Sequence, residues 1–243
     1  FALEKQLDDM PTAFRATFGS GKPVIAFLGE YDALSALSQQ AGCLTKMPVE
    51  TGAPGHGCGH NLLGVGSLAA ALAAMVGNLA VGKPKYADEQ EGILASIDRL
   101  SQLRAKLLGL VAADADAYLP LNRAYRMPRG TEDEAAARQA AIQEALGPAC
   151  DIPLEIMEAC SAIIDEADYL ARHGSKLAVS DAGAAAVLAR GALVSAAMNI
   201  FLNVDDMTDP DRALRYRSRV NEMMISAQMR SDIVASLVMG YLQ

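Results

Sequence analysis

Tryptophan is absent from this 243-residue chain, aromatic residues make up only 5% of it, and it contains three histidines and four cysteines. Because single-stranded nucleic acid is held by stacking on aromatic side chains, the scarcity of aromatics argues against that partner. Scattered cysteines in such small number do not form a disulfide framework, which favours a reducing cytoplasm. Basic residues are outnumbered too, and the net charge of −8 argues against nucleic acid or an anionic membrane as the main partner.

The composition that remains is that of a folded soluble protein, with 51% hydrophobic and 21% charged residues. One stretch, residues 61–82, carries no charge and is long enough to cross a bilayer. It consists mainly of alanine and glycine with Ser67 and Asn78 inside, which favours a buried helix, so no membrane partner is expected. The chain begins with Phe1, and we interpret this as a cut or incomplete end.

The hydrophobic pattern changes abruptly near residue 65. Residues 22–29 form a short apolar run bounded by proline and glycine, which predicts a buried strand, and Glu30 and Asp32 follow it. No convincing strand follows residue 66. The sequence therefore predicts a mainly α fold, a helical bundle over residues 66–243 preceded by a small, incomplete α/β segment over residues 1–65.

Helices are predicted throughout the second part. Apolar residues recur every three or four positions over 93–111, and Thr131 with Glu134 forms a capping box that opens another helix. A third helix is predicted from near Asp151 to Gly174, and a fourth from a cap at Ser180 or Asp181 to about 201. Asp209 and Pro210 open the last one, whose apolar face is predicted to comprise Leu214, Val220, Met224, Ala227, Ile233 and Leu237.

The segment 56–60 places three candidate metal ligands within five residues: His56, Cys58 and His60. Thiolate and imidazole are good ligands for zinc, and the intervening glycines let the backbone bend around an ion. The alternative is a glycine-rich turn without metal. Together with segments 11–14, 29–34 and 54–67, this run resembles metal-dependent amidohydrolases of the aminobenzoyl-glutamate hydrolase type.

That resemblance implies that Cys58 and His60 are zinc or manganese ligands, with Asp32 nearby. It also implies a Glu-Glu pair and two further histidines downstream, but the chain has no Glu-Glu dipeptide and only His173 follows. Two ligands without a general base do not activate water usefully. We therefore interpret the first 67 residues as a remnant of such an enzyme and expect no working metal centre there.

The second part carries charged and tyrosine side chains in an ordered set. Lys83, Lys85 and Tyr86 follow the uncharged stretch, Asp114 and Tyr118 lie four apart on one helix face, and Asp181 opens an apolar helix. Arg126 and Arg129 lie between helices. Without further information, the lysines are equally compatible with solvated surface residues, Asp114 with a surface aspartate and Asp181 with a helix cap; the pattern alone leaves this alternative open.

The order of these segments resembles the cyclodeaminase/cyclohydrolase family, from about residue 68 to the end. The segment 196–203 and the neighbourhoods of Tyr86, Asp114 and Asp181 carry the likeness. It implies a dimeric helical bundle that binds a tetrahydrofolate derivative as its substrate and needs no metal. The roles it implies are catalytic for Asp114, Asp181 and Lys85, and substrate-binding for Lys83, Tyr86, Tyr118, Arg126 and Arg129.

The reaction stays open between hydrolysis of methenyl-tetrahydrofolate and deamination of formimino-tetrahydrofolate. In the family, a glycine-rich loop precedes the first helix, and here hydrolase-like sequence that ends with residues 64–67 replaces it. A natural fusion and a recombined or misassembled reading frame both explain this departure. The alternatives are a metal-dependent amidohydrolase or peptidase-like protein and a catalytically inactive dimerising bundle. In each case we expect a soluble, cytoplasmic homodimer.

Overall fold

The computed structural model describes residues 2–5, 14–17, 47, 49–51 and 60–243. Five long helices dominate it: α1 (His60–Asn78), α2 (Gln90–Tyr125), α3 (Glu132–His173), α4 (Val179–Val204) and α5 (Pro210–Leu242). Short 3-10 helices, η2 (Pro84–Glu89) and η3 (Lys176–Ala178), precede α2 and α4. The predicted mainly α fold is confirmed. The strand predicted at 22–29 lies outside the described residues.

A small hairpin near the N-terminus was not anticipated. Strand β1 (Ala2–Lys5) pairs antiparallel with β2 (Phe14–Thr17), so that Ala2 lies opposite Thr17. Glu4 and Arg15 are cross-strand partners and form an ion pair at 2.5 Å. Each strand has only four residues, and neither contains a continuous apolar run of the kind that predicted the strand at 22–29.

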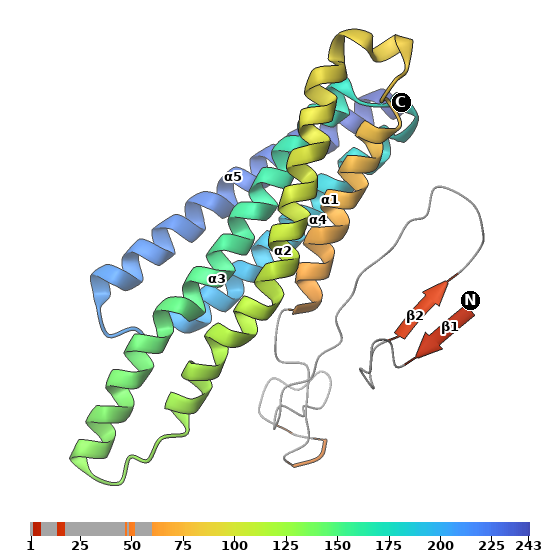
Figure 1. Cartoon of the computed structure of the whole chain (residues 1–243). Helices are drawn as coiled ribbons and strands as arrows, with labels where there is room; N and C mark the ends of the chain where they lie inside the picture. Colours follow the sequence, from red (N-terminus) through yellow and green to blue (C-terminus); the bar gives the residue numbers. More distant parts are fainter. Residues whose placement is uncertain (1, 6–13, 18–46, 48, 52–59) are drawn as a thin grey trace.

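The long helices form an elongated bundle (Figure 1). Helices α1 to α4 pack around one core, in which α4 contacts α1 and α3, and α2 also contacts α1 and α3. Helix α5 packs outside, against α4 and α3. Alanines fill much of the core, including Ala69, Ala73, Ala182, Ala185 and Ala189, and such small side chains let the helix backbones approach closely.

The two ends of this bundle are built from different segments. At the η2 end, α1 and α3 finish and α2 and α4 begin; the backbone N–H of Ser175 donates to the carbonyl of Val76 there. At the opposite end, α2 turns into α3, and we call this the hairpin end of the bundle, after the α2–α3 hairpin and not the β1–β2 hairpin. There the side chain of Gln143 on α3 holds the α4–α5 connection: its amide N–H donates to the carbonyl of Asp206, and its amide oxygen accepts from the backbone N–H of Thr208. A second, smaller core under this end contains Leu121, Ile142 and Leu146.

Two predicted helix starts are confirmed by their capping bonds. Thr131 accepts from the backbone N–H of Glu134, whose carboxylate accepts in return from Thr131 N–H. Asp209 accepts from the backbone N–H groups of Asp211 and Arg212, with Pro210 in the first turn. The predicted stop at Gly174 is confirmed as the C-cap of α3.

The prediction of separate helices after Thr131 and near Asp151 was wrong, because α3 runs unbroken through Pro148 and Pro153. A proline inside a helix leaves the carbonyl four residues earlier without its partner. For Pro153 that carbonyl is Ala149, and the side-chain amide of Asn203 on α4 donates to it at 2.9 Å. Tertiary packing thus replaces the missing helix bond.

Two further details of the prediction were wrong. Helix α4 begins at Val179 with Ala178 as its N-cap, so Ser180 and Asp181 lie inside the first turn instead of capping it. On α5, Val220 and Ala227 are buried as predicted, but Leu214 and Ile233 are 62% and 53% exposed. The predicted boundary at residue 65 falls within α1 and stays a prediction.

Candidate functional site

Three of the predicted site residues, Lys83, Lys85 and Tyr86, lie together at the η2 end. Lys83 is the extended N-cap of η2, and the Lys85 ammonium lies 5.6 Å from the centroid of the Tyr86 ring. The side-chain amide of Gln90 donates to the carbonyls of Tyr86 and Ala80 and thereby holds the turn in place. Both lysines are exposed, so this corner presents two positive charges to solvent.

Tyr86 connects this corner to the start of α4. Its hydroxyl accepts a hydrogen bond of 3.2 Å from the backbone N–H of Lys176. This bond stabilises the phenolate and lowers the pKa of Tyr86 below its ordinary value, with Lys85 and Lys176 acting in the same direction. Lys176, which the sequence analysis missed, lies 4.0 Å above the ring of Tyr241 and donates to two carbonyls at the end of α3.

Asp181 lies partly buried in the first turn of α4, at the same η2 end as the lysines. A carboxylate in a first helical turn interacts favourably with the positive end of the helix dipole. His173, the last residue of α3, stacks on Tyr169 and forms a 3.0 Å ion-pair contact with Glu89. His173 is therefore a helix-end residue.

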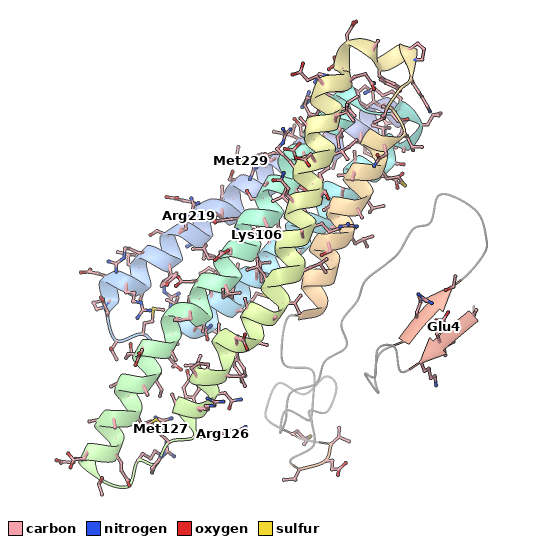
Figure 2. The ribbon with its side chains drawn as sticks, in the orientation of Figure 1. Glu4, Lys106, Arg126, Met127, Arg219 and Met229 are labelled. Carbon is pink, nitrogen blue, oxygen red and sulfur yellow. The ribbon has the colours of Figure 1, made fainter. Side chains whose placement is uncertain are left out.

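The remaining predicted residues lie towards the other end of α2. Asp114 and Tyr118 are partly buried in its second half, Arg126 is its C-cap, and Arg129 is exposed in the loop that follows. Figure 2 shows Arg126 at the hairpin end, beside Met127. Close by, the Tyr125 hydroxyl donates to Asp206, and burial together with this carboxylate raises the Tyr125 pKa.

Within one chain, the predicted residues therefore form two groups. Asp114 lies 24 positions after the start of α2, which at 1.5 Å per residue is about 36 Å along the helix from the η2 end. Asp181 lies at the η2 end of the parallel helix α4, so more than about 20 Å separates the two aspartates along the bundle. A single pocket of one chain does not contain both.

A polar groove between α3 and α5 was not predicted. It has a volume of about 460 Å³, and its charged lining residues are Glu158, Asp165, Arg219, Glu222 and Arg230. Arg230 donates to Asp165 and to the Ser161 hydroxyl, and Arg219 pairs with Glu158 at 3.4 Å. Because these arginines are satisfied by carboxylates of the same chain, the groove serves chiefly to hold α5 on α3.

The thiols of the bundle are inert. Cys150 and Cys160 are buried in the main core, and burial raises the pKa of each to about 12. In the part of the chain that the structure describes, no three histidine, cysteine, aspartate or glutamate side chains are grouped as metal ligands. Cys58 lies outside that part, and the side chain of His60, the first residue of α1, is not described.

One helix, spanning residues 176–204 with η3 and α4, is apolar and long enough to cross a membrane by length and composition alone, with a mean hydropathy of 1.7. The core helix of a bundle passes the same test. Helix α4 packs against α1, α3 and α5, and 44% of the most apolar 18-residue stretch of this helix is buried inside the protein.

Comparison with known proteins gives a family match for most of the chain. The formiminotransferase-cyclodeaminase family matches residues 43–222. A methenyltetrahydrofolate cyclohydrolase from Methylorubrum extorquens is 39% identical over 144 residues, which is 59% of this chain and 69% of that protein. A solved formiminotetrahydrofolate cyclodeaminase from Thermotoga maritima shares the fold, with a TM-score of 0.66 and 24% identity over 76% of this chain and 88% of that one.

A different relative matches a shorter stretch. A p-aminobenzoyl-glutamate hydrolase chain of Escherichia coli is 59% identical over 73 residues, 30% of this chain. The match spans only 15% of that hydrolase chain. Both resemblances identified from the sequence are thus confirmed, one over a large part of the bundle and one over a fragment.

Proposed function

Because the chain belongs to the formiminotransferase-cyclodeaminase family, we propose that it acts on the one-carbon group of a tetrahydrofolate derivative. The first candidate reaction is hydrolysis of the methenyl group. The observation that carries this proposal is the 39% identity to a methenyltetrahydrofolate cyclohydrolase, of which the matched residues cover 69%. The second candidate is deamination of the formimino derivative, which the family name favours.

Hydrolysis of a methenyl group requires two proton movements. The oxygen of water forms a bond to the cationic methenyl carbon and loses one proton to a carboxylate, which later passes it to solvent. The remaining hydroxyl proton moves to one of the two nitrogens as the bond from the carbon to that nitrogen breaks, leaving a formyl group and a neutral amine. Asp114 or Asp181 is the proposed carboxylate, since an anionic oxygen both accepts the proton and stabilises the cation. Lys85 is the proposed proton donor.

The anionic tail of the substrate needs positive charge on a protein whose net charge is −8. Lys83, Lys85 and Lys176 supply three local cations at the η2 end, beside Tyr86. Arg126 and Arg129, with Tyr118, provide a second basic cluster at the hairpin end. We propose that folate is held by these groups in a cytoplasmic homodimer that needs no metal, and that neither nucleic acid nor a membrane is a partner.

The test is the absorbance decay of methenyl-tetrahydrofolate with purified protein, with and without a chelator. We expect acceleration over buffer that the chelator leaves unchanged. Ammonia release from formimino-tetrahydrofolate, without methenyl hydrolysis, would establish the second candidate instead. Acceleration abolished by the chelator would favour the amidohydrolase alternative, and no reaction with a folded bundle would favour the inactive one.

Variants of the aspartates test the proposed roles. The variant that removes the acting carboxylate, Asp114→Asn or Asp181→Asn, is expected to lower kcat by about 100-fold or more, the usual size of a general acid–base contribution. Asp168→Asn is the control, because Asp168 is a surface partner of Arg172. Full activity in Asp114→Asn with loss in Asp181→Asn would remove Asp114 from the mechanism.

A further inference from the structure

The side chain of Gln90, the first residue of α2, is bonded to three points of the segment 80–86, which carries both lysines of the η2 end. Its amide N–H groups donate to the carbonyls of Ala80 at 3.1 Å and Tyr86 at 2.9 Å, and its amide oxygen accepts from the backbone N–H of Gly82 at 2.8 Å. Gly82 has a φ of 71°, in the left-handed region that favours glycine. An amide offers two donors and two acceptor positions, so three of the four are used to shape this loop.

Tyr86 ties the same loop to the segment that precedes α4. Its ring packs against the main core, and its hydroxyl accepts from the backbone N–H of Lys176 at 3.2 Å. Lys176 is the first residue of η3, and its ammonium donates to the carbonyls of Ala171 and Arg172 at the end of α3. The tyrosine hydroxyl therefore joins two segments that are 90 positions apart in the sequence, and it is already engaged within the chain.

The point that Tyr86 contacts is close to Asp181. Helix α4 follows η3 directly, and five positions separate Lys176 from Asp181, which is about 8 Å along a helix at 1.5 Å per residue. The backbone N–H of the neighbouring Ser175 donates to the Val76 carbonyl, so this segment is also fixed on α1. Hydrogen bonds thus join the loop of the lysines, the start of α4 and the end of α1.

A fixed distance between the lysines and Asp181 matters for the proposed substrate, because a planar aminobenzoyl ring separates the one-carbon group of a folate from its glutamate tail. Such a rigid spacer does not bend to reach a misplaced partner. Lys83 and Lys85 are exposed, and no hydrogen bond or ion pair ties either ammonium to another part of the described chain. The place of both charges therefore depends on the backbone that Gln90 and Tyr86 hold.

We propose that Tyr86 and Gln90 are positioning residues of the proposed reaction. Through their hydrogen bonds they fix the two lysines at one distance from Asp181, so that the tail and the one-carbon group of the substrate are held together in the reactive geometry. This role rests on the proposed function, and for Tyr86 it differs from the direct contact with the substrate that the family resemblance implied. A site that is shaped before binding loses less freedom when the ligand arrives, and misplacement of a reacting group by about 1 Å can cost about 100-fold in rate.

Direct contact of Tyr86 with the substrate is the alternative, and a double-mutant cycle separates the two roles. Tyr86→Phe removes only the hydroxyl, and we expect it to raise KM several-fold, as we do for Gln90→Leu. In a chain that already carries Lys83→Gln and Lys85→Gln, neither change is expected to raise KM further, because the lysines through which they act are absent. Multiplication of the separate effects would show that the hydroxyl acts independently of the lysines, and would overturn the positioning role.

Tyr216→Phe is the matched control for the loss of a tyrosine hydroxyl. The Tyr216 hydroxyl also bonds to another helix, donating to Asp151 on α3, but it has no link to the lysine loop. We expect KM to stay at the wild-type value in this variant, with all variants folded at the assay temperature by circular dichroism. An equal rise of KM in Tyr216→Phe and Tyr86→Phe would point to a general loss of stability and contradict the proposal.

Amide hydrogen exchange tests the two anchors without any ligand. The N–H of Gly82 should exchange several-fold faster in Gln90→Leu, and that of Lys176 several-fold faster in Tyr86→Phe, because each loses its acceptor. Amides in the middle of α3 should keep their protection in both variants. Unchanged exchange at both positions would overturn the proposal, whatever the activity.

Binding of folic acid, measured by calorimetry, separates a failure of this proposal from a failure of the proposed function. An inactive wild type that binds folic acid, with the same non-additive pattern in Kd, would remove the proposed reaction and support the positioning role. An active wild type whose KM responds to neither Tyr86→Phe nor Gln90→Leu would support the reaction and remove the role. A wild type that neither reacts nor binds folic acid would overturn both.

Discussion

At the residue scale, single side chains of one helix satisfy backbone groups of another. Pro153 leaves the Ala149 carbonyl without its helical donor, and Asn203 donates to it from α4. Gly147, six positions before Pro153, makes room for Arg212: a Cβ there would lie 2.3 Å from the guanidinium, which donates to the Gln143 carbonyl at 3.1 Å. The proline-containing part of α3 is thus held by neighbours that are distant in sequence.

Removal of the Asn203 amide is expected to destabilise the bundle. Asn203→Ala and Asn203→Asp both leave the Ala149 carbonyl without a donor, and a buried acceptor that loses its partner costs about 1–3 kcal/mol. The measurement is the free energy of unfolding by urea. Asn199→Ala, one turn earlier on α4, is the control and should change it by less than about 0.5 kcal/mol. Unchanged stability in both Asn203 variants would show that the bond contributes nothing.

At the element scale, contacts with α3 hold the amphipathic helix α5. Tyr216 donates to Asp151 at 2.6 Å, Arg219 pairs with Glu158, and Arg230 reaches Asp165. Each of these contacts lies on the flank of α5 beside α3, while Val220 and Ala227 are buried. Periodicity in the sequence identified the helix, but it assigned Leu214 and Ile233 to the buried face because side-chain type does not reveal which flank has a neighbour.

The Tyr216 contact predicts a loss of stability at alkaline pH. Burial and the Asp151 carboxylate raise the pKa of Tyr216 to about 12, above its ordinary value of 10. A raised pKa in the folded state contributes stability that is complete below pH 10 and is lost as the pH rises towards 12. Urea unfolding at pH 8, 10 and 11 should therefore show a smaller decline for Tyr216→Phe than for the wild type. Equal declines would contradict this linkage.

At the scale of the whole molecule, an acidic bundle carries a local group of basic residues at each of its two ends. Lys83, Lys85 and Lys176 lie at the η2 end, and Arg126 and Arg129 at the hairpin end, on a chain with net charge −8. Overall charge therefore repels a polyanionic substrate while local clusters attract its tail. Binding that depends on such exposed charges weakens as salt screens them.

The double variant Lys83→Gln/Lys85→Gln tests this charge cluster. We expect KM to rise several-fold at low salt, with the difference from wild type shrinking at high salt, and kcat to fall as well because Lys85 is the proposed proton donor. Lys106→Gln is the control: Lys106 lies midway along α2 (Figure 2), paired with Glu155 at 3.1 Å. A KM unchanged by salt and by the double variant would exclude a role of these lysines in binding.

Local signals in the sequence predicted the helical class, the capped starts of α3 and α5 and the stop at Gly174, because caps and periodicity involve residues within a few positions of one another. The order of the motif segments along the chain indicated the family. The continuity of α3 was not predictable, since Asn203, which replaces the missing bond at Pro153, lies 54 positions from Ala149. Likewise, the sequence identified Asp114 and Asp181 as candidates but not their separation, which follows from the parallel course of α2 and α4. Tertiary packing alone decided that distance.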